Sequence, residues 1–174
     1  LEFRRVLFRS VTDDTWKSTK GNIVASEIYD GETVDARSEK TGWAMPGYND
    51  ADWNTVKVGA FDFNNLIATY NEPIRKHETF KPVKLITTPK GEKVLDFGQN
   101  LVGWVQLKLH GNKGDIVHIY HAEVLDKAGN FYTDNLRAAK ATATYILKGN
   151  GEEIFEPHFT FFGFRFIKIE GIDG

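Results

Sequence analysis

The fold class of this 174-residue chain is predicted from the stretch Phe162-Gly163-Phe164-Arg165-Phe166-Ile167-Lys168-Ile169. Phenylalanine recurs at every second position, and in a β-strand this spacing places side chains on one face of the sheet. The three phenylalanines are therefore expected to share one core. Period-two alternation of apolar residues recurs in residues 104–109 and 115–123. These segments are also predicted to be strands.

Short segments rich in glycine and asparagine separate the predicted strands, at residues 110–114, 126–130 and 148–151. Such residues tolerate positive φ angles and are typical of turns. The chain is 13% aromatic, which favours a half-buried pleated surface. The sequence therefore predicts an all-β protein, a β-sandwich or jelly roll.

Two boundaries divide the chain. Residues 1–10 mix arginine with phenylalanine and leucine, lack an initiator Met and resemble translated cloning sequence, so we predict a non-native leader. A second boundary is predicted near Asn71-Glu72-Pro73. Residues 11–73 are then the end of a larger, truncated β-module, and residues 74–174 form a second β-sandwich.

Composition excludes several classes of function. The chain has 22 Lys+Arg, 24 Asp+Glu and a formal net charge of -2, and no basic run follows the first ten residues. Nucleic acid is therefore not an expected partner. Apolar runs are too short to span a bilayer, so no membrane insertion is expected. The absence of cysteine excludes zinc-thiolate sites and cysteine nucleophiles, but it suits both cytoplasmic and exported proteins.

The densest acidic cluster is Ile28-Tyr29-Asp30-Gly31-Glu32-Thr33-Val34-Asp35-Ala36-Arg37. Its three carboxylates could coordinate a hard cation such as calcium or accept hydrogen bonds from sugar hydroxyls. The alternative is a turn with solvated acids, one of them paired with Arg37. Trp43 and Trp53 lie in loops rich in Gly, Pro and Asp, where their rings could stack on a sugar or pack in a core.

No catalytic arrangement emerges from the residues alone. His118 and His121 are three positions apart, which on a strand places them on opposite faces and argues against joint metal ligation. The serines lack the context of a nucleophile elbow. A glycosidase needs two carboxylates at a defined separation, which the sequence does not establish.

Several longer strings resemble bacterial α-L-rhamnosidases of glycoside hydrolase family 78. The acidic cluster at residues 28–37 and the tryptophans at positions 43 and 53 resemble the latter part of the family's N-terminal domain. The strings that resemble the next module are Asp96-Phe97-Gly98-Gln99-Asn100-Leu101-Val102-Gly103-Trp104, His121-Ala122-Glu123-Val124-Leu125-Asp126, Gly129-Asn130-Phe131-Tyr132-Thr133-Asp134-Asn135-Leu136-Arg137 and Phe159-Thr160-Phe161-Phe162-Gly163-Phe164-Arg165. They follow the family's order from about residue 12 to residue 171.

The resemblance implies that residues 11–73 belong to the N-terminal β-domain and residues 74–174 to the concanavalin-like accessory module. Members of the family remove terminal α-L-rhamnose from glycosides with inversion, in an (α/α)6 barrel that follows these β-domains. The parent protein would therefore be a bacterial glycosidase. This chain ends where the barrel would begin, so we expect no catalytic residue in it, and its own catalytic domain is the expected partner.

Some family members also bind rhamnose without cleaving it, together with calcium. By resemblance, the candidate carbohydrate-binding residues are Asp30, Glu32, Asp35 and Trp53, and the candidate calcium ligands are Asp30 and Glu32. The expected ligand is a rhamnose-containing glycan or glycoside. Two alternatives stay open, a free-standing carbohydrate-binding module and a purely structural β-domain.

Overall fold

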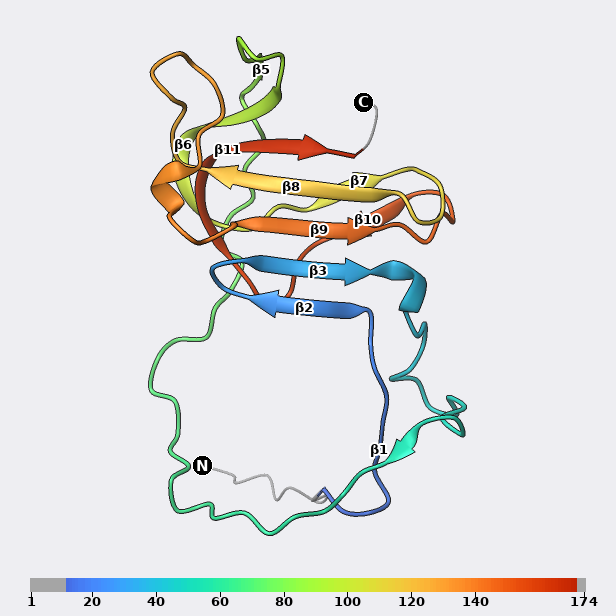
Figure 1. Cartoon of the computed structure of the whole chain (residues 1–174). Coiled ribbons are helices and arrows are strands. Elements are labelled where there is room, and N and C mark those ends of the chain that lie inside the picture. Colours follow the sequence, from blue (N-terminus) through green and yellow to red (C-terminus); the bar gives the residue numbers. More distant parts are fainter. Residues whose placement is uncertain (1–11, 172–174) are drawn as a thin grey trace, which may run out of the picture. The chain divides into compact units, whose positions relative to one another are not determined.

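A computed structural model describes residues 12–171 of the chain, which form an all-β structure as predicted (Figure 1). Within this part of the chain, the helical segments are two 3₁₀ turns, η1 (Ala36–Ser38) and η2 (Asp134–Leu136). None of the described helices is long and apolar enough to cross a membrane. The predicted leader at residues 1–10 lies outside the described residues.

The main element of the structure is a seven-stranded sheet with the order β2-β3-β9-β8-β11-β6-β5. Neighbouring strands are antiparallel except for the pair β3 and β9, which is parallel. The strands are β2 (Ile23–Glu27), β3 (Gly31–Asp35), β5 (Lys84–Thr87), β6 (Lys93–Gly103), β8 (Ile116–Ala122), β9 (Thr142–Ile146) and β11 (Phe162–Glu170).

A second, two-stranded sheet covers one face of the large sheet. It pairs β7 (Leu107–Leu109) with β10 (Glu153–Phe155). Leu109 and Phe155 from this pair belong to the same buried cluster as Val117 and Tyr145 of the large sheet. The Tyr145 and Phe155 rings lie 4.8 Å apart. The two layers enclose a hydrophobic core, and the predicted sandwich architecture is confirmed.

Strand β11 departs from the simple alternation in its sequence. Phe162 and Phe164 belong to the main core, whereas Phe166 packs on the opposite face in a small cluster with Val94 and Ala122. The expectation that the three phenylalanines share one core is therefore wrong for Phe166. The cause is a register shift against β6 between Phe164 and Phe166, because an irregularity of this kind re-aims the side chains that follow it.

An ion pair holds this irregularity in place. The Arg165 guanidinium donates from Nε to Asp96 Oδ1 at 2.8 Å and from Nη2 to Oδ2 at 3.0 Å. The backbone amide of Gly98 donates to the same carboxylate at 2.7 Å. Arg165 holds the pKa of Asp96 below its usual range despite the burial of that carboxyl group. Bidentate pairs of this kind fix geometry as well as charge.

Two compact units divide the chain, one of residues 12–20 with 41–75 and one of residues 21–40 with 76–171. Strands β2 and β3 thus belong to the large sheet, although they lie upstream of the boundary predicted near residues 71–73. That boundary stays a prediction about the limits of the domains. At the start of the second stretch of the larger unit, Lys76 pairs with Glu156.

The smaller unit contains little regular structure. Strands β1 (Lys17–Ser18) and β4 (Asn54–Thr55) form an antiparallel pair. Lys17 Nζ lies 2.8 Å from Asp50 Oδ1. The Trp53 ring packs edge-on against Tyr48, with the ring centroids 5.8 Å apart.

Replacing Phe164 by alanine should lower the free energy of unfolding by about 3–5 kcal/mol, because the change leaves a cavity in the main core. The Phe164 ring is buried and lies 5.5 Å from Phe97 and 5.1 Å from His121. Urea unfolding followed by circular dichroism measures the change. The exposed Phe159 is the matched control, and Phe159→Ala should cost about 0.5 kcal/mol or less. Equal effects of the two changes would contradict the proposed core.

Candidate functional site

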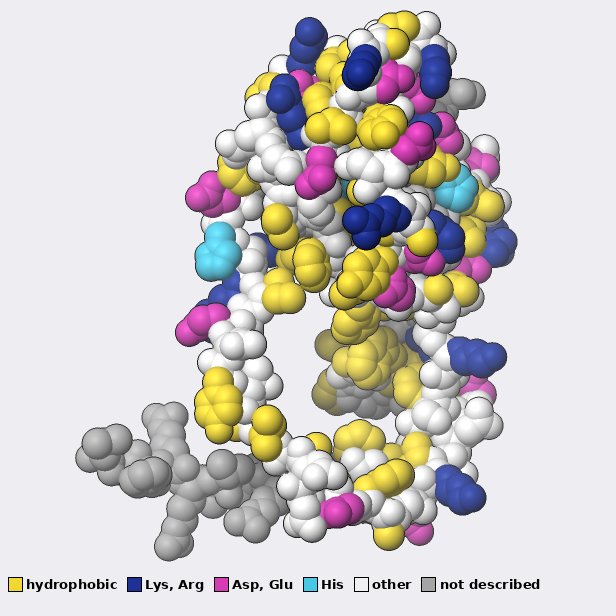
Figure 2. All heavy atoms as spheres, turned by 60° about the vertical axis from the view of Figure 1, so that its left-hand side comes forward, with side chains coloured by type: hydrophobic (Ala, Val, Ile, Leu, Met, Phe, Trp, Pro, Cys, Tyr) yellow, Lys and Arg dark blue, Asp and Glu magenta, His cyan; other side chains and the backbone are white. Residues whose placement is uncertain are grey.

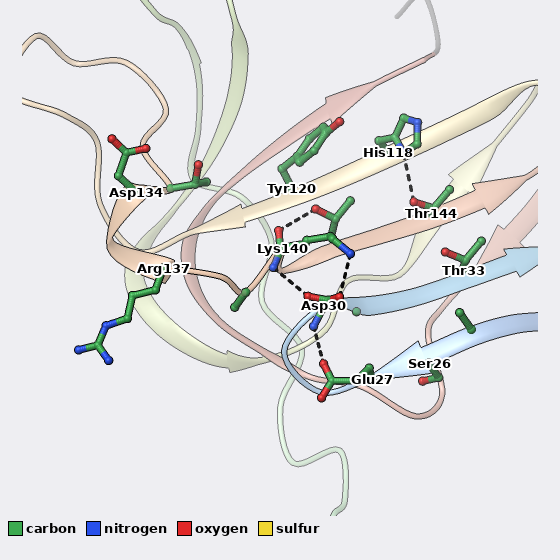
Figure 3. A pocket seen from close by; sticks show the side chains of 15 residues that line it. Ser26, Glu27, Asp30, Thr33, His118, Tyr120, Asp134, Arg137, Lys140 and Thr144 are labelled. Carbon is green, nitrogen blue, oxygen red and sulfur yellow. Dashed lines mark hydrogen bonds and ion pairs between the residues drawn. The ribbon is translucent and has the colours of Figure 1, made fainter.

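A hollow of about 690 Å³ lies on the face of the large sheet opposite the main core (Figure 3). Its floor comes from strands β3, β8 and β9, and its rim comes from β2, the turn that follows β2, and the loop at residues 133–140. The lining residues are Ala25, Ser26, Glu27, Asp30, Gly31, Thr33, His118, Tyr120, Thr133, Asp134, Arg137, Ala139, Lys140, Thr142 and Thr144.

The turn between β2 and β3 shapes one side of the hollow. The Glu27 carboxylate accepts from the backbone amides of Tyr29 at 2.6 Å and Asp30 at 2.7 Å. Gly31 has a φ of 107°, and a Cβ at this position would overlap the carbonyl oxygen of Thr142. Glycine is therefore required where the turn meets β9, because any side chain would push the two segments apart.

An ion pair joins this turn to the loop before β9. Lys140 Nζ lies 2.8 Å from Asp30 Oδ2, and the Lys140 backbone amide donates to Oδ1 at 3.4 Å. Figure 3 shows the two side chains facing each other, with Arg137 extended away from them. The hydrogen bond with Lys140 lowers the pKa of Asp30, and Asp30 raises the pKa of Lys140. Both groups are charged at neutral pH.

Hydroxyl and ring groups line the floor of the hollow. Thr33 pairs with Thr144 across β3 and β9, and Thr144 Oγ1 lies 3.1 Å from His118 Nδ1. The Thr142 hydroxyl donates to the Lys140 carbonyl at 2.7 Å. Burial raises the pKa of Tyr120, and the nearby Glu170 adds to this effect. The floor therefore offers hydroxyl and ring groups for hydrogen bonding beside the ion pair of Asp30 and Lys140.

This set of groups suits the binding of a polyhydroxylated molecule better than bond cleavage. A carboxylate accepts hydrogen bonds from hydroxyl groups, an ammonium donates them, and threonine hydroxyls do both. A glycosidase needs a carboxyl group with a raised pKa to act as a general acid. The pKa of Asp30 is shifted in the opposite direction. The hollow is therefore a candidate binding site.

Of the four candidate residues from the sequence, Asp30 alone lines the hollow. Glu32 is only 1% exposed, and its carboxylate accepts from the backbone amides of His158 at 3.0 Å and Phe159 at 2.9 Å. Asp35 pairs with Arg37 at 2.8 Å and accepts from the Arg37 backbone amide. Asp35 therefore fits the alternative interpretation of the acidic cluster, in which Arg37 pairs with one of its acids.

Trp53 belongs to the smaller unit, whereas Asp30, Glu32 and Asp35 belong to the larger one. Among residues 12–171, no group of three or more His, Asp or Glu side chains could hold a metal ion. The carboxylates of Asp30 and Glu32 have protein partners, so this donor set offers calcium few free oxygens. Their roles as calcium ligands, and those of the four residues toward a sugar, stay predictions.

Most residues of the hollow carry no signal that sequence reasoning could have used. Lys140 lies 110 positions from Asp30, and nothing in the sequence around either residue indicates that the two side chains are in contact. The threonines of β9 look like ordinary strand residues, since threonine is common in strands. One inference was correct, because His118 faces the hollow whereas His121 is buried on the other face of β8.

Comparison with known protein families identifies the chain. The model of the bacterial alpha-L-rhamnosidase concanavalin-like domain matches residues 86–174, and that of the alpha-L-rhamnosidase N-terminal domain matches residues 6–78. The chain belongs to the bacterial α-L-rhamnosidase family. The resemblance drawn from the sequence motifs is thereby confirmed.

Individual α-L-rhamnosidases are similar over nearly the whole chain. The enzyme of Streptomyces avermitilis is 44% identical over 168 residues, which cover 95% of this chain and 16% of that protein. A crystal structure of Streptomyces avermitilis alpha-L-rhamnosidase complexed with L-rhamnose is 42% identical and has a TM-score of 0.86, covering 94% of this chain and 16% of that one. The structure of the α-L-rhamnosidase from Dictyoglumus thermophilum is 38% identical and has a TM-score of 0.87, covering 95% of this chain and 19% of that one. The chain thus spans less than a fifth of these relatives.

Replacing Glu32 by glutamine should lower the free energy of unfolding by about 1–3 kcal/mol, because an amide NH₂ would then face buried backbone amides that need an acceptor. Thermal and chemical unfolding measure the loss. The control is Glu152→Gln, which removes an exposed pair with Lys108 and should cost about 0–1 kcal/mol. If calcium stabilised the wild type and not Glu32→Gln, Glu32 would be a metal ligand and its structural role would be refuted.

Proposed function

We propose that this chain forms non-catalytic accessory β-domains of an inverting α-L-rhamnosidase that hydrolyses terminal α-L-rhamnose from glycosides. We further propose that the hollow beside Asp30 and Lys140 holds a rhamnose unit of the substrate. The observation that carries this proposal is the Asp30 and Lys140 pair above a floor of threonine hydroxyls. Membership of the α-L-rhamnosidase family supports rhamnose as the sugar.

The chemistry of L-rhamnose matches the groups in the hollow. Adjacent ring hydroxyls can donate to the Asp30 carboxylate and accept from the Lys140 ammonium. The sugar also carries a methyl group in place of a hydroxymethyl group. Ala25 and Ala139 offer small apolar surface at the rim, and Tyr120 adds an aromatic side chain to the lining.

The ion pair between Asp30 and Lys140 can separate with little loss of stability. The side chains of Asp30 and Lys140 are both exposed to solvent, and ion pairs between exposed charges contribute little to stability. A sugar that takes over their hydrogen bonds therefore displaces a weak interaction. The proposed contact joins the sugar directly to Asp30 and Lys140. Whether binding also requires calcium, as the family resemblance implies, is tested by titration with and without the metal.

A supporting role toward the catalytic domain rests on a different surface. The segment of residues 58–74 in the smaller unit, here called the apolar segment, exposes all of its large apolar side chains, namely Val58, Phe61, Phe63, Leu66, Ile67, Tyr70 and Ile74. Apolar side chains also appear as yellow spheres on the face drawn in Figure 2. Exposed apolar groups gathered in this way are typical of interaction surfaces. We propose that the apolar segment contacts the catalytic part of the enzyme.

Calorimetric titration of the whole chain with L-rhamnose, in calcium and in EDTA, should detect binding. Asp30→Ala should weaken it about tenfold or more, because a charged hydrogen-bond acceptor is lost. The control Glu152→Ala removes an exposed carboxylate that lies outside the hollow and should leave the affinity unchanged. Absence of heat with a folded sample would refute rhamnose binding and leave the scaffold role. An unchanged affinity in Asp30→Ala would refute the location of the site.

Docking can be tested by coexpression with the Streptomyces avermitilis enzyme lacking the region that this chain matches. The two polypeptides should elute together in size-exclusion chromatography. Ile67→Asp should abolish coelution, because Ile67 is 82% exposed and a charge there opposes burial in an interface. The matched control is Val102→Asp, at a residue that is 80% exposed on the larger unit. Equal behaviour of the two variants would contradict contact through the apolar segment.

A further inference from the structure

His121 is the buried side chain of the larger unit whose role the core packing does not explain. It is 1% exposed, its ring stacks on Phe162 with centroids 3.8 Å apart, and it meets Phe164 edge-on. Its Nε2 atom has no hydrogen-bond partner within the described part of the chain. A leucine or phenylalanine would fill this space without leaving a polar atom unpaired. The group that distinguishes His121 from an apolar residue at this position is the ring nitrogen Nδ1, which can form a hydrogen bond.

The Nδ1 atom lies 2.8 Å from the carbonyl oxygen of Ala141. The backbone amide of His121 donates to the same oxygen at 3.2 Å. Because a carbonyl only accepts, Nδ1 must carry the proton in this contact. Burial lowers the pKa of His121 to about 4, so the ring stays neutral near neutral pH. One side chain thus fixes one backbone oxygen with a defined tautomer.

Ala141 is the point where the loop of the hollow turns into strand β9. Its φ is 45°, a left-handed conformation that is strained for alanine. Its amide donates to the Tyr29 carbonyl at 3.0 Å, and the next amide, of Thr142, donates to the Asp30 carbonyl at 3.0 Å. The strained residue is therefore held from one side by the turn after β2 and from the other side by His121.

Lys140 immediately precedes this strained residue. Its ammonium group and its backbone amide both donate to the Asp30 carboxylate. We propose that His121 is a positioning residue, whose Nδ1–H group holds the left-handed turn at Ala141 and so keeps Lys140 facing Asp30 in the hollow. The consequence for ligand binding rests on the function proposed above, whereas the effect on the Lys140 and Asp30 pair does not.

The first test needs no ligand. In His121→Leu, the pKa of Asp30, measured by ¹³C NMR titration of the whole chain, should rise from its lowered value toward the ordinary value. In His121→Asn it should stay low, because the asparagine amide can place an N–H group near the position of Nδ1. The control Ile119→Val disturbs the same strand in the core and should leave the titration of Asp30 unchanged. An unchanged pKa of Asp30 in His121→Leu, or an equal shift of that pKa in Ile119→Val, would overturn the proposal.

A second measurement covers the case in which His121→Leu does not fold. The ¹⁵N chemical shifts of the His121 ring in the wild type should report the Nδ1-protonated tautomer at neutral pH. The Nε2-protonated tautomer would overturn the proposal, because its Nδ1 could not donate to Ala141.

L-rhamnose calorimetry separates this inference from the proposed function. His121→Leu should weaken binding about tenfold, the effect of one lost hydrogen bond, and His121→Asn should restore it. Wild-type protein that binds no rhamnose would refute rhamnose binding in the hollow, and the Asp30 titration would still decide the role of His121. Intact binding in His121→Leu with a shifted Asp30 would overturn the claim that the hollow depends on His121.

Discussion

The pairing of Asp96 with Arg165 is the constraint on which the larger unit depends. It sits where residues 97–100 of β6 have only Arg165 of β11 opposite them. Because β11 lies between β8 and β6, a change of face at this point affects both neighbours. Before the pair, β11 supplies Phe164 to the main core, and after it Phe166 and Lys168 point to the other face. The side chains of β11 thus change from one face of the sheet to the other at this bidentate contact.

This irregularity marks the limit of what the pattern of the sequence predicts about the fold. Alternation correctly predicts the strands, the buried Phe164 and the opposite orientations of His118 and His121. Alternation assumes a continuous period of two, so it misplaces Phe166, because a shift in strand pairing leaves no trace in the apolar pattern. Alternation also does not show which strands pair with each other. The parallel pairing of β3 with β9, for example, joins segments about 110 residues apart.

The candidate site is harder to predict, for a related reason. Asp30 and Glu32 are two positions apart and look equivalent in the acidic cluster. The first ends a turn at the rim of the hollow, and the second points into the protein interior, where backbone amides occupy its carboxylate. Composition does not separate the two roles, because both are acidic residues beside a glycine. What separates them is the burial of each side chain, which depends on segments remote in the sequence.

The motifs that identify the family serve mainly to build the fold. Asp96 and Arg165 come from two of these motifs and pair with each other. Asp126 and Asn130 come from two others, and the Asn130 backbone amide donates to the Asp126 carboxylate at 2.8 Å. His121 comes from the same motif as Asp126 and fixes the Ala141 carbonyl. Lys140 and the threonines of β9 lie outside all of these motifs. Asp30, Asp134 and Arg137 lie inside the motifs and also line the hollow, so the motifs cover the contacts of the scaffold and part of the candidate site. The ligand itself must be argued from the chemistry of the hollow, because a fold does not determine a function.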